Sequence, residues 1–235
     1  MLVEGEKVLK YYLTEGMESG KMIVTGKPSS DTLYHGYLKY RDNQIGNSGD
    51  ADNLRVLLAV PQMGEHKTFE WEEHLKEIDF MFECLTRDKK VELILSLHPK
   101  MRKEDYIDFA VKYDCKFATG NIYEEIPRCD LFVSICSSTL TSALALGKKG
   151  VAILYVYYYG DGAGVFDSAV NLAMVYQKQD LPHVISEAIR EVRDTAAESN
   201  EFDPEWSIVD GKSVARIVGH IYREIEKSLH IRSFT

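Results

Sequence analysis

The chain has 235 residues, 45% of them hydrophobic and 28% charged, which is typical of a globular protein. No apolar run is long enough to span a bilayer, and the N-terminus lacks the basic-then-apolar order of a secretory signal, so we expect a cytoplasmic location. The net charge of −9 argues against nucleic-acid binding, because proteins that bind nucleic acids usually carry a basic surplus.

The predicted elements begin with a helix over 5–15 and a short strand over 21–25, followed by a polar connector over 26–53. Apolar runs then predict strands over 55–60, 91–97, 116–118, 131–135, 151–157 and 173–176. Helical spacing predicts helices over 69–85, 103–113, 139–146, 181–195 and 212–229, with a helical turn at 123–127. The alternation and the unbroken apolar strands indicate an α/β fold, a Rossmann-like, doubly wound parallel sheet covered on both faces.

The chain contains four cysteines, Cys84, Cys115, Cys129 and Cys136. None of them forms a CxxC pair with a matching histidine pair, so we expect no zinc site. Cys129 and Cys136 flank a predicted strand, which favours buried free thiols in a reducing compartment.

Four hydroxyl side chains follow the predicted strand 131–135 and open the next helix: Ser137, Ser138, Thr139 and Thr141. In doubly wound folds, ligands bind at the carboxyl ends of the strands. The first N–H groups of a helix have no intrahelical partner and carry partial positive charge, so they suit a phosphate. Simple N-capping is the alternative, but one cap accounts for one hydroxyl and not for four. We therefore favour a phosphate site at this helix.

Two further loops are predicted at the same edge of the sheet. His98 closes a strand ahead of Pro99, and it is either a structural histidine or a hydrogen-bond donor to a phosphate or a sugar hydroxyl. Gly64 follows the first strand of the alternating region and permits close approach of the backbone to a ligand. Next to it, Glu65 and His66 are either an acid or base, or the polar first turn of a helix.

Short motifs spread over nearly the whole chain support a more specific interpretation. They are GEKVLKYYL (5–13), KMIVTGKPSSD (21–31), HP (98–99), NIYEEIPRCD (121–130), CSST (136–139) and DGKSVARIV (210–218). Together they resemble the crossover, HP motif, base-binding loop, serine motif and closing helix of GT-B nucleotide-sugar enzymes. The likeness is to UDP-N-acetylglucosamine 2-epimerases and bacterial polysaccharide glycosyltransferases, and it implies the C-terminal half of a GT-B fold.

The resemblance implies a nucleotide-sugar donor linked through UDP, CDP or CMP, with no permanently bound cofactor and no metal. The binding residues that it implies are Gly64, Tyr123, Ser137, Ser138, Thr139 and Thr141, and the catalytic candidates are His66 and His98. The hydroxyls and His98 are expected at the phosphates, and the backbone near Tyr123 at the base. His66 is expected, with the glycine beside it, to face the reacting sugar.

The resemblance also divides the chain into a crossover helix and strand over 1–25, a nucleotide-sugar-binding domain over 26–210 and a closing helix over 211–235. GT-B enzymes normally place the active site between two such domains, and this chain begins just before the crossover. We therefore expect an N-terminal GT-B domain, a partner chain that supplies it, or a homodimer, and no activity from the isolated half. Peripheral membrane association through a partner fits this arrangement.

The hypothesis is thus the donor domain of a glycosyltransferase of surface polysaccharide or glycan synthesis. One alternative is a 2-epimerase-like enzyme, in which the helix after the serine motif usually carries a glutamate for the ribose, whereas residues 140–146 contain no acid. Another is a non-catalytic subunit or binding domain that needs a partner half. Exposed apolar faces on the helices predicted at 5–15 and 212–229 would indicate a partner.

Overall fold

The computed structural model of the chain describes residues 1–44, 53–135, 137–156, 164–195 and 202–232. Its central sheet has six parallel strands in the order β5 (Lys116–Phe117), β4 (Val91–Ser96), β3 (Leu54–Ala59), β6 (Leu131–Ile135), β7 (Lys149–Ile153) and β8 (Leu172–Val175). In chain order, β3, β4 and β5 add to one side of this sheet, and β6, β7 and β8 add to the other side. The direction of winding therefore reverses between β3 and β6, where a doubly wound sheet has its switch point.

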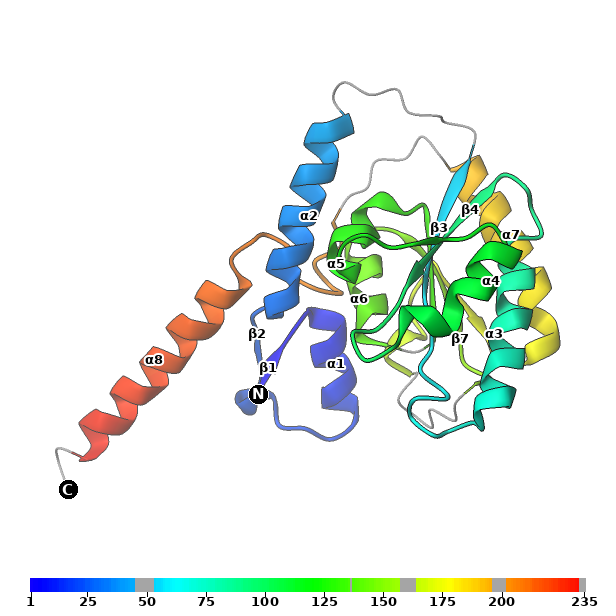
Figure 1. The fold of residues 1–235 in the computed structure, drawn as a ribbon. Helices are drawn as coiled ribbons and strands as arrows, with labels where there is room; N and C mark the ends of the chain where they lie inside the picture. The colour runs from blue at the N-terminus through cyan, green and yellow to red at the C-terminus, as the bar shows by residue number, and fades with distance from the viewer. Residues whose placement is uncertain (45–52, 136, 157–163, 196–201, 233–235) are drawn as a thin grey trace.

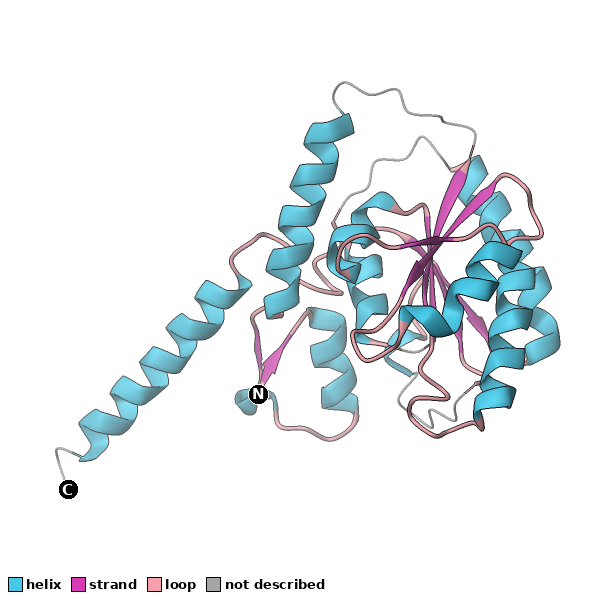
Figure 2. Ribbon diagram, in the orientation of Figure 1, coloured by secondary structure: helices cyan, strands magenta, loops and turns pink. Residues whose placement is uncertain are grey.

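Helices cover both faces of this sheet (Figures 1 and 2). One layer holds α3 (Trp71–Leu85), α4 (Ile107–Lys112) and α7 (Leu181–Asp194), and the other holds α2 (Pro28–Gln44), α5 (Ile122–Glu125) and α6 (Ser138–Ala145). Side chains alternate along each strand, so that Val56 and Leu58 join the first core while Leu57 joins the second. The predicted fold class, a doubly wound parallel sheet covered on both faces, is confirmed.

Two segments lie outside this sandwich. Strands β1 (Leu2–Val3) and β2 (Ile23–Val24) form a separate two-stranded parallel sheet beside α1 (Glu6–Thr14). The last helix, α8 (Ser213–Arg232), extends away from the body (Figure 1). Its first turn is capped by Asp31, whose carboxylate accepts the N–H groups of Ser213 at 2.8 Å and Val214 at 2.9 Å. The domain boundaries at 25 and 210 stay predictions.

The polar connector expected over 26–53 is wrong for most of its length, because α2 occupies residues 28–44. Glycine, asparagine, aspartate and serine concentrate at the two ends of the stretch, whereas residues 32–41 are compatible with a helix. Leu33 in this middle part is fully buried in the core beneath α2 and α5. Burial of this side chain in the core therefore stabilises the helix. The helix does not show in a composition that is averaged over all 28 residues.

Smaller differences concern element ends and thiols. The helix expected over 103–113 divides into a 3-10 turn (Lys103–Tyr106) and α4, and the strand expected over 151–157 is β7, which ends at Ile153. The described cysteines are free, and burial raises the pKa of the Cys84 thiol to about 11. Cys136 lies outside the described residues. In the part of the chain that the structure describes, no helix is long and apolar enough to cross a membrane.

Candidate functional site

A cavity of about 590 Å³ opens at the carboxyl ends of β3, β4 and β6, at the switch point of the sheet. It is lined by residues 59–62, 66, 96–99, 120–123, 134–135 and 137–139. The loop after β3, the loop after β4, the loop before β6 and the first turn of α6 thus meet around one space. The sequence predicted that loops at this edge of the sheet lie together, and six of the eight candidate residues belong to the lining of the cavity: His66, His98, Tyr123, Ser137, Ser138 and Thr139. Gly64 and Thr141 do not belong to it.

The described lining carries no formal charge of its own, since it contains no Asp, Glu, Lys or Arg side chain. Hydroxyls, imidazoles, two side-chain amides and backbone N–H groups supply its polarity instead. An anion in this space would therefore be stabilised by hydrogen bonds and by the dipole of α6. Within the described residues, no group of three or more His, Cys, Asp or Glu side chains is placed to hold a metal ion.

The first turn of α6 forms one wall of the cavity. Ser137 is the N-cap: its Oγ accepts the N–H of Thr139 at 3.2 Å and shares a 2.5 Å hydrogen bond with the Thr139 hydroxyl. Ser138 is exposed, and neither its amide N–H nor its hydroxyl has a hydrogen-bond partner among the described residues. Ser138 therefore offers the donors that are free at the positive end of the helix.

Thr141, the fourth hydroxyl of the cluster, has a different place. It is buried, and its Oγ1 donates to the Ser138 carbonyl at 2.8 Å. It also accepts a 2.9 Å hydrogen bond from the Lys27 ammonium, which forms an ion pair with Glu4 at 2.6 Å. Its hydroxyl thus ties the N-terminal segment to α6, and the structure does not bring it to the cavity.

His98 lies exposed at the rim, where β4 ends. Its Nδ1 accepts the N–H of Lys100 at 3.2 Å, so in the neutral ring the hydrogen is on Nε2. No described residue accepts a hydrogen bond from that Nε2. The ring can therefore donate to a ligand in the cavity without giving up a contact of the fold.

His66 and Gly64 share the loop after β3 but have different surroundings. His66 is exposed and belongs to the lining. Gly64 packs against Trp71: a Cβ at this position would lie 2.5 Å from the indole ring and 3.0 Å from His74. Close packing against α3 accounts for a glycine here, and Gly64 is not part of the cavity lining. Its approach to a ligand stays a prediction.

Tyr123 lines the cavity from α5, but its backbone is already engaged. The Tyr123 N–H donates to the side chain of Asn121 at 2.9 Å, within a capping box that Glu124 completes. The Tyr123 carbonyl lies against Gly36 of α2, where a Cβ would be only 3.0 Å away. A contact from this residue to a base would thus come from its ring rather than from its backbone.

The sequence analysis missed two polar groups of the cavity. Ser134 in β6 is fully buried and lines the cavity, and its Oγ has no hydrogen-bond partner among the described residues. The same holds for the buried Nε2 of Gln62. Unpartnered buried polar atoms are rare and call for an explanation such as a ligand. A serine within an otherwise apolar strand was the available signal for Ser134.

A buried carboxylate, Glu125, also escaped the sequence analysis. Its Oε1 accepts the N–H groups of Thr119 at 3.3 Å and Gly120 at 3.2 Å, and its Oε2 faces Arg55 at 3.4 Å. Glu125 is 2% exposed, so these contacts shape the loop at 119–121 from the inside. That loop contributes Gly120 and Asn121 to the lining of the cavity, and Glu125 therefore supports the site without entering it.

Comparisons with known proteins were informative only at the level of structure. No family model matches the sequence, and no curated protein matches it significantly. Among solved structures, the UDP co-structure of S. aureus MnaA is similar with a TM-score of 0.61 and 15% identity, over 96% of this chain and 59% of that chain. Wall teichoic acid polymerase TagF soaked with CDPG has a TM-score of 0.54 and 15% identity, over 97% of this chain and 57% of that chain.

A third similar structure is the UDP-GlcNAc 2-epimerase from Neisseria meningitidis bound to UDP-GlcNAc, with a TM-score of 0.53 and 16% identity, over 93% of this chain and 59% of that chain. At such low identity the likeness establishes the fold, and not the activity. The chain has the GT-B type of fold that its motifs indicated, and it spans less than two thirds of the length of these proteins. This extent is consistent with the expected C-terminal half.

Proposed function

We propose that the chain is the nucleotide-sugar-binding half of a GT-B glycosyltransferase that acts in surface polysaccharide or glycan synthesis. The observation that carries this proposal is the cavity at the switch point, where the free donors of Ser138 meet His98 and the unpartnered Ser134. The similar proteins whose structures contain UDP, UDP-GlcNAc or CDPG support a ligand of the same class.

The proposed binding mode follows from the donors on each wall. The phosphates lie at the first turn of α6, bound by Ser138 and by the Nε2 hydrogen of His98. The base lies along residues 120–123, against the ring of Tyr123, and the sugar extends toward His66. Transfer then depends on stabilising the leaving phosphate with oriented dipoles, and the residues present require neither a metal nor a bound cofactor for that step.

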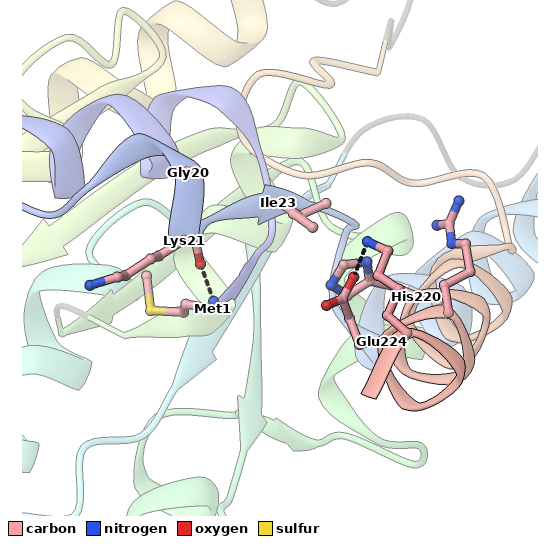
Figure 3. A pocket seen from close by; sticks show the side chains of 8 residues that line it. Met1, Gly20, Lys21, Ile23, His220 and Glu224 are labelled. Atoms are coloured by element: carbon pink, nitrogen blue, oxygen red, sulfur yellow. Dashed lines mark hydrogen bonds and ion pairs between the residues drawn. The ribbon is translucent and has the colours of Figure 1, made fainter. Parts of the chain in front are cut away.

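A second domain is part of the proposal. Apolar side chains on α8 are 42–61% exposed and recur at helical spacing, at Val214, Val218, Ile221, Ile225 and Leu229. A hollow of about 630 Å³ lies between this helix and the β1–β2 segment. Figure 3 shows Ile23 on one side of it and His220 and Glu224 on the other. Such exposed apolar surface favours a covering partner, which we propose to be a GT-B N-terminal domain.

That domain would supply the acceptor site and any peripheral contact with a membrane, and a homodimer is the competing arrangement. A separate N-terminal half, mixed with this chain, should form a complex of one copy of each. Self-association of this chain alone, abolished by Ile221→Asp, would favour the homodimer instead. We also propose a cytoplasmic location, in keeping with the free thiols of the described cysteines.

A 2-epimerase-like enzyme is the alternative within the same fold, supported by the likeness to the UDP-GlcNAc 2-epimerase from Neisseria meningitidis. The described lining of the cavity offers no carboxylate to a ribose, which disfavours it. Formation of UDP-N-acetylmannosamine from UDP-N-acetylglucosamine without any acceptor would establish it. A non-catalytic subunit would bind a partner half but turn over nothing.

Calorimetric titration with UDP, CDP, CMP and UDP-N-acetylglucosamine tests the proposal. We expect saturable binding of one nucleotide class, weakened roughly ten- to a hundredfold by Ser138→Ala, since hydrogen bonds to charged groups contribute about 1.5–3 kcal/mol. Ser142→Ala is the matched control, because Ser142 lies buried on the same helix, has no hydrogen-bond partner in the described ranges and is not part of the lining. Absence of binding by all four ligands would contradict a site that is complete in this chain.

A further inference from the structure

The loop after β3 carries two residues of the cavity lining, Gln62 and His66. It folds back on itself: the N–H of His66 donates to the Gln62 carbonyl at 2.9 Å, and the N–H of Thr68 donates to the Met63 carbonyl at 2.9 Å. Met63 is fully buried in the core. These hydrogen bonds fix the backbone of the loop. The orientation of its side chains depends on the contacts of Glu65, which is next to His66.

Glu65 is held by a buried chain of hydrogen bonds. The hydroxyl of Tyr106 donates to Glu65 Oε1 at 2.8 Å, and the same hydroxyl is 2.8 Å from Nε2 of His74. Tyr106 and His74 are both fully buried. Because a phenol has one hydrogen and Tyr106 gives it to Glu65, the second contact requires a hydrogen on His74 Nε2. The order of donation is therefore His74 to Tyr106 to Glu65.

This chain of bonds connects two loops of the cavity. Glu65 belongs to the loop after β3, whereas Tyr106 ends the segment that starts at His98 after β4. That segment is anchored by Met101, whose N–H donates to the His98 carbonyl at 2.8 Å and whose side chain is buried in the core. Tyr106 thus joins the loop of one rim histidine to the loop of the other.

Stability alone does not account for the arrangement. Within the part of the chain that the structure describes, the buried atoms Glu65 Oε2 and His74 Nδ1 have no hydrogen-bond partner, and neither do Gln62 Nε2 and Ser134 Oγ in the cavity. Each such atom costs free energy that an apolar replacement would not, so a purely structural role would favour apolar side chains here. A concentration of unpartnered polar atoms next to a cavity is expected where the protein positions groups for a ligand.

Resting on the proposed function, we propose that Tyr106 is a positioning residue of the nucleotide-sugar cavity. Acting through Glu65, it orients Gln62 and His66 toward the sugar end of the bound nucleotide sugar. Without the phenol hydroxyl, Glu65 loses its only hydrogen-bond donor among the described residues, and the loop that carries His66 gains alternative positions. The ligand then meets a cavity that is no longer arranged for it.

The chain offers a closely matched control for Tyr106→Phe. The hydroxyl of Tyr155 donates to Glu77 Oε1 at 2.7 Å, and Glu77 lies on α3, as His74 does. Burial raises the pKa of both phenols above the ordinary value. Tyr155 does not belong to the cavity lining or to its loops. Tyr155→Phe therefore removes the same kind of bond at a site that the proposal does not involve.

The test measures the affinity for UDP-N-acetylglucosamine and for UDP, and the side-chain NMR signals of His66 with and without ligand. We expect Tyr106→Phe to weaken the binding of UDP-N-acetylglucosamine about tenfold, which corresponds to about 1.4 kcal/mol. The binding of UDP alone should weaken much less, because the hydrogen bonds from His74 through Tyr106 to Glu65 act on the sugar end of the ligand. The His66 signals should shift or broaden in the same variant. Tyr155→Phe should leave affinity and signals unchanged.

A conservative variant separates positioning from packing. Glu65→Gln keeps an oxygen that accepts from Tyr106, so it should retain the affinity, whereas Glu65→Ala should behave as Tyr106→Phe does. Unchanged His66 signals and unchanged affinity in Tyr106→Phe would overturn the proposal. Failure of the wild-type chain to bind either ligand would count against the proposed function, while the His66 signals of the free protein would still decide whether Tyr106 positions the loop.

Discussion

The ammonium of Lys27 donates a 2.7 Å hydrogen bond to the carbonyl of Ser138, across 111 residues of sequence. The contact fastens the segment that precedes the sheet to the first turn of α6. A cation at the positive end of a helix is unfavourable by itself, and Glu4, 2.6 Å away, offsets it. These contacts therefore hold the N-terminal segment against the wall of the cavity that α6 forms.

Lys27→Met should lower the free energy of unfolding by about 1–2 kcal/mol, because it leaves the half-buried Glu4 carboxylate without its cation. Urea unfolding measures the change. Lys21→Met is the control: Lys21 pairs with Glu18 at 2.9 Å, but both side chains are more than 70% exposed, so its loss should matter little. Equal effects of the two substitutions would show that the Lys27 contact contributes no more than a surface pair.

His98 offers a prediction about one nitrogen atom. In His98→Asn the side-chain oxygen can still accept the N–H of Lys100, as Nδ1 does, but no donor reaches the position of Nε2. In His98→Gln the amide N–H₂ approximates the Nε2 donor. We expect the asparagine variant to bind UDP about tenfold more weakly than the wild-type chain, and the glutamine variant to lose less. If the two variants bind equally, Nε2 makes no contact with the ligand.

The strands in the middle of the large sheet were predictable because most of their residues are buried and their sequences are mainly apolar. The apolar runs at 131–135 and 91–97 predicted the bounds of β6 and β4 to within one residue. The two-residue strand β1 is too short for any periodicity, and it forms only because β2 lies beside it. α2 was missed because its helical middle is flanked on both sides by turn-forming residues.

The site was predictable in location but not in its assignments. Four hydroxyls at one strand end pointed to α6, yet Thr141 is bound to Lys27, which is 114 residues away in the chain. The sequence predicts that Gly64 faces a ligand, whereas in the structure Gly64 packs against Trp71. Such partners are set by tertiary structure, and no local pattern encodes them. The roles of the remaining candidates at a ligand stay predictions.

Glu125 should be among the most sensitive polar positions for stability. Glu125→Ala removes the acceptor of two backbone N–H groups and leaves Arg55 without this partner, so we expect a loss of about 3 kcal/mol. Glu124→Ala, next to it, removes only a capping-box contact and should cost about 1 kcal/mol. Urea unfolding compares the two. Similar losses would mean that the buried carboxylate is not what holds the loop at 119–121.

The pH dependence of stability should report on His74. Burial lowers the pKa of this imidazole, an effect that nearby Glu65 partly opposes. The folded chain therefore binds a proton at His74 less readily than the unfolded chain, in which the pKa is about 6.5. Above the pKa of the unfolded chain, His74 is neutral in both states and does not reduce the free energy of unfolding. As the pH falls from that value toward the lowered pKa of the folded state, the free energy of unfolding decreases.

His74→Gln keeps a donor for Tyr106 but has no proton to gain, so its free energy of unfolding should fall less than that of the wild-type chain as the pH drops from 7.5 to about 5.5. Urea unfolding at several pH values in this window measures the difference. His183→Gln, an exposed position on α7, should keep the wild-type pH slope. If the pH slope of His74→Gln equals that of the wild-type chain, His74 takes up its proton without disturbing its hydrogen bond to Tyr106. Burial of this ring then imposes no penalty on the charged form.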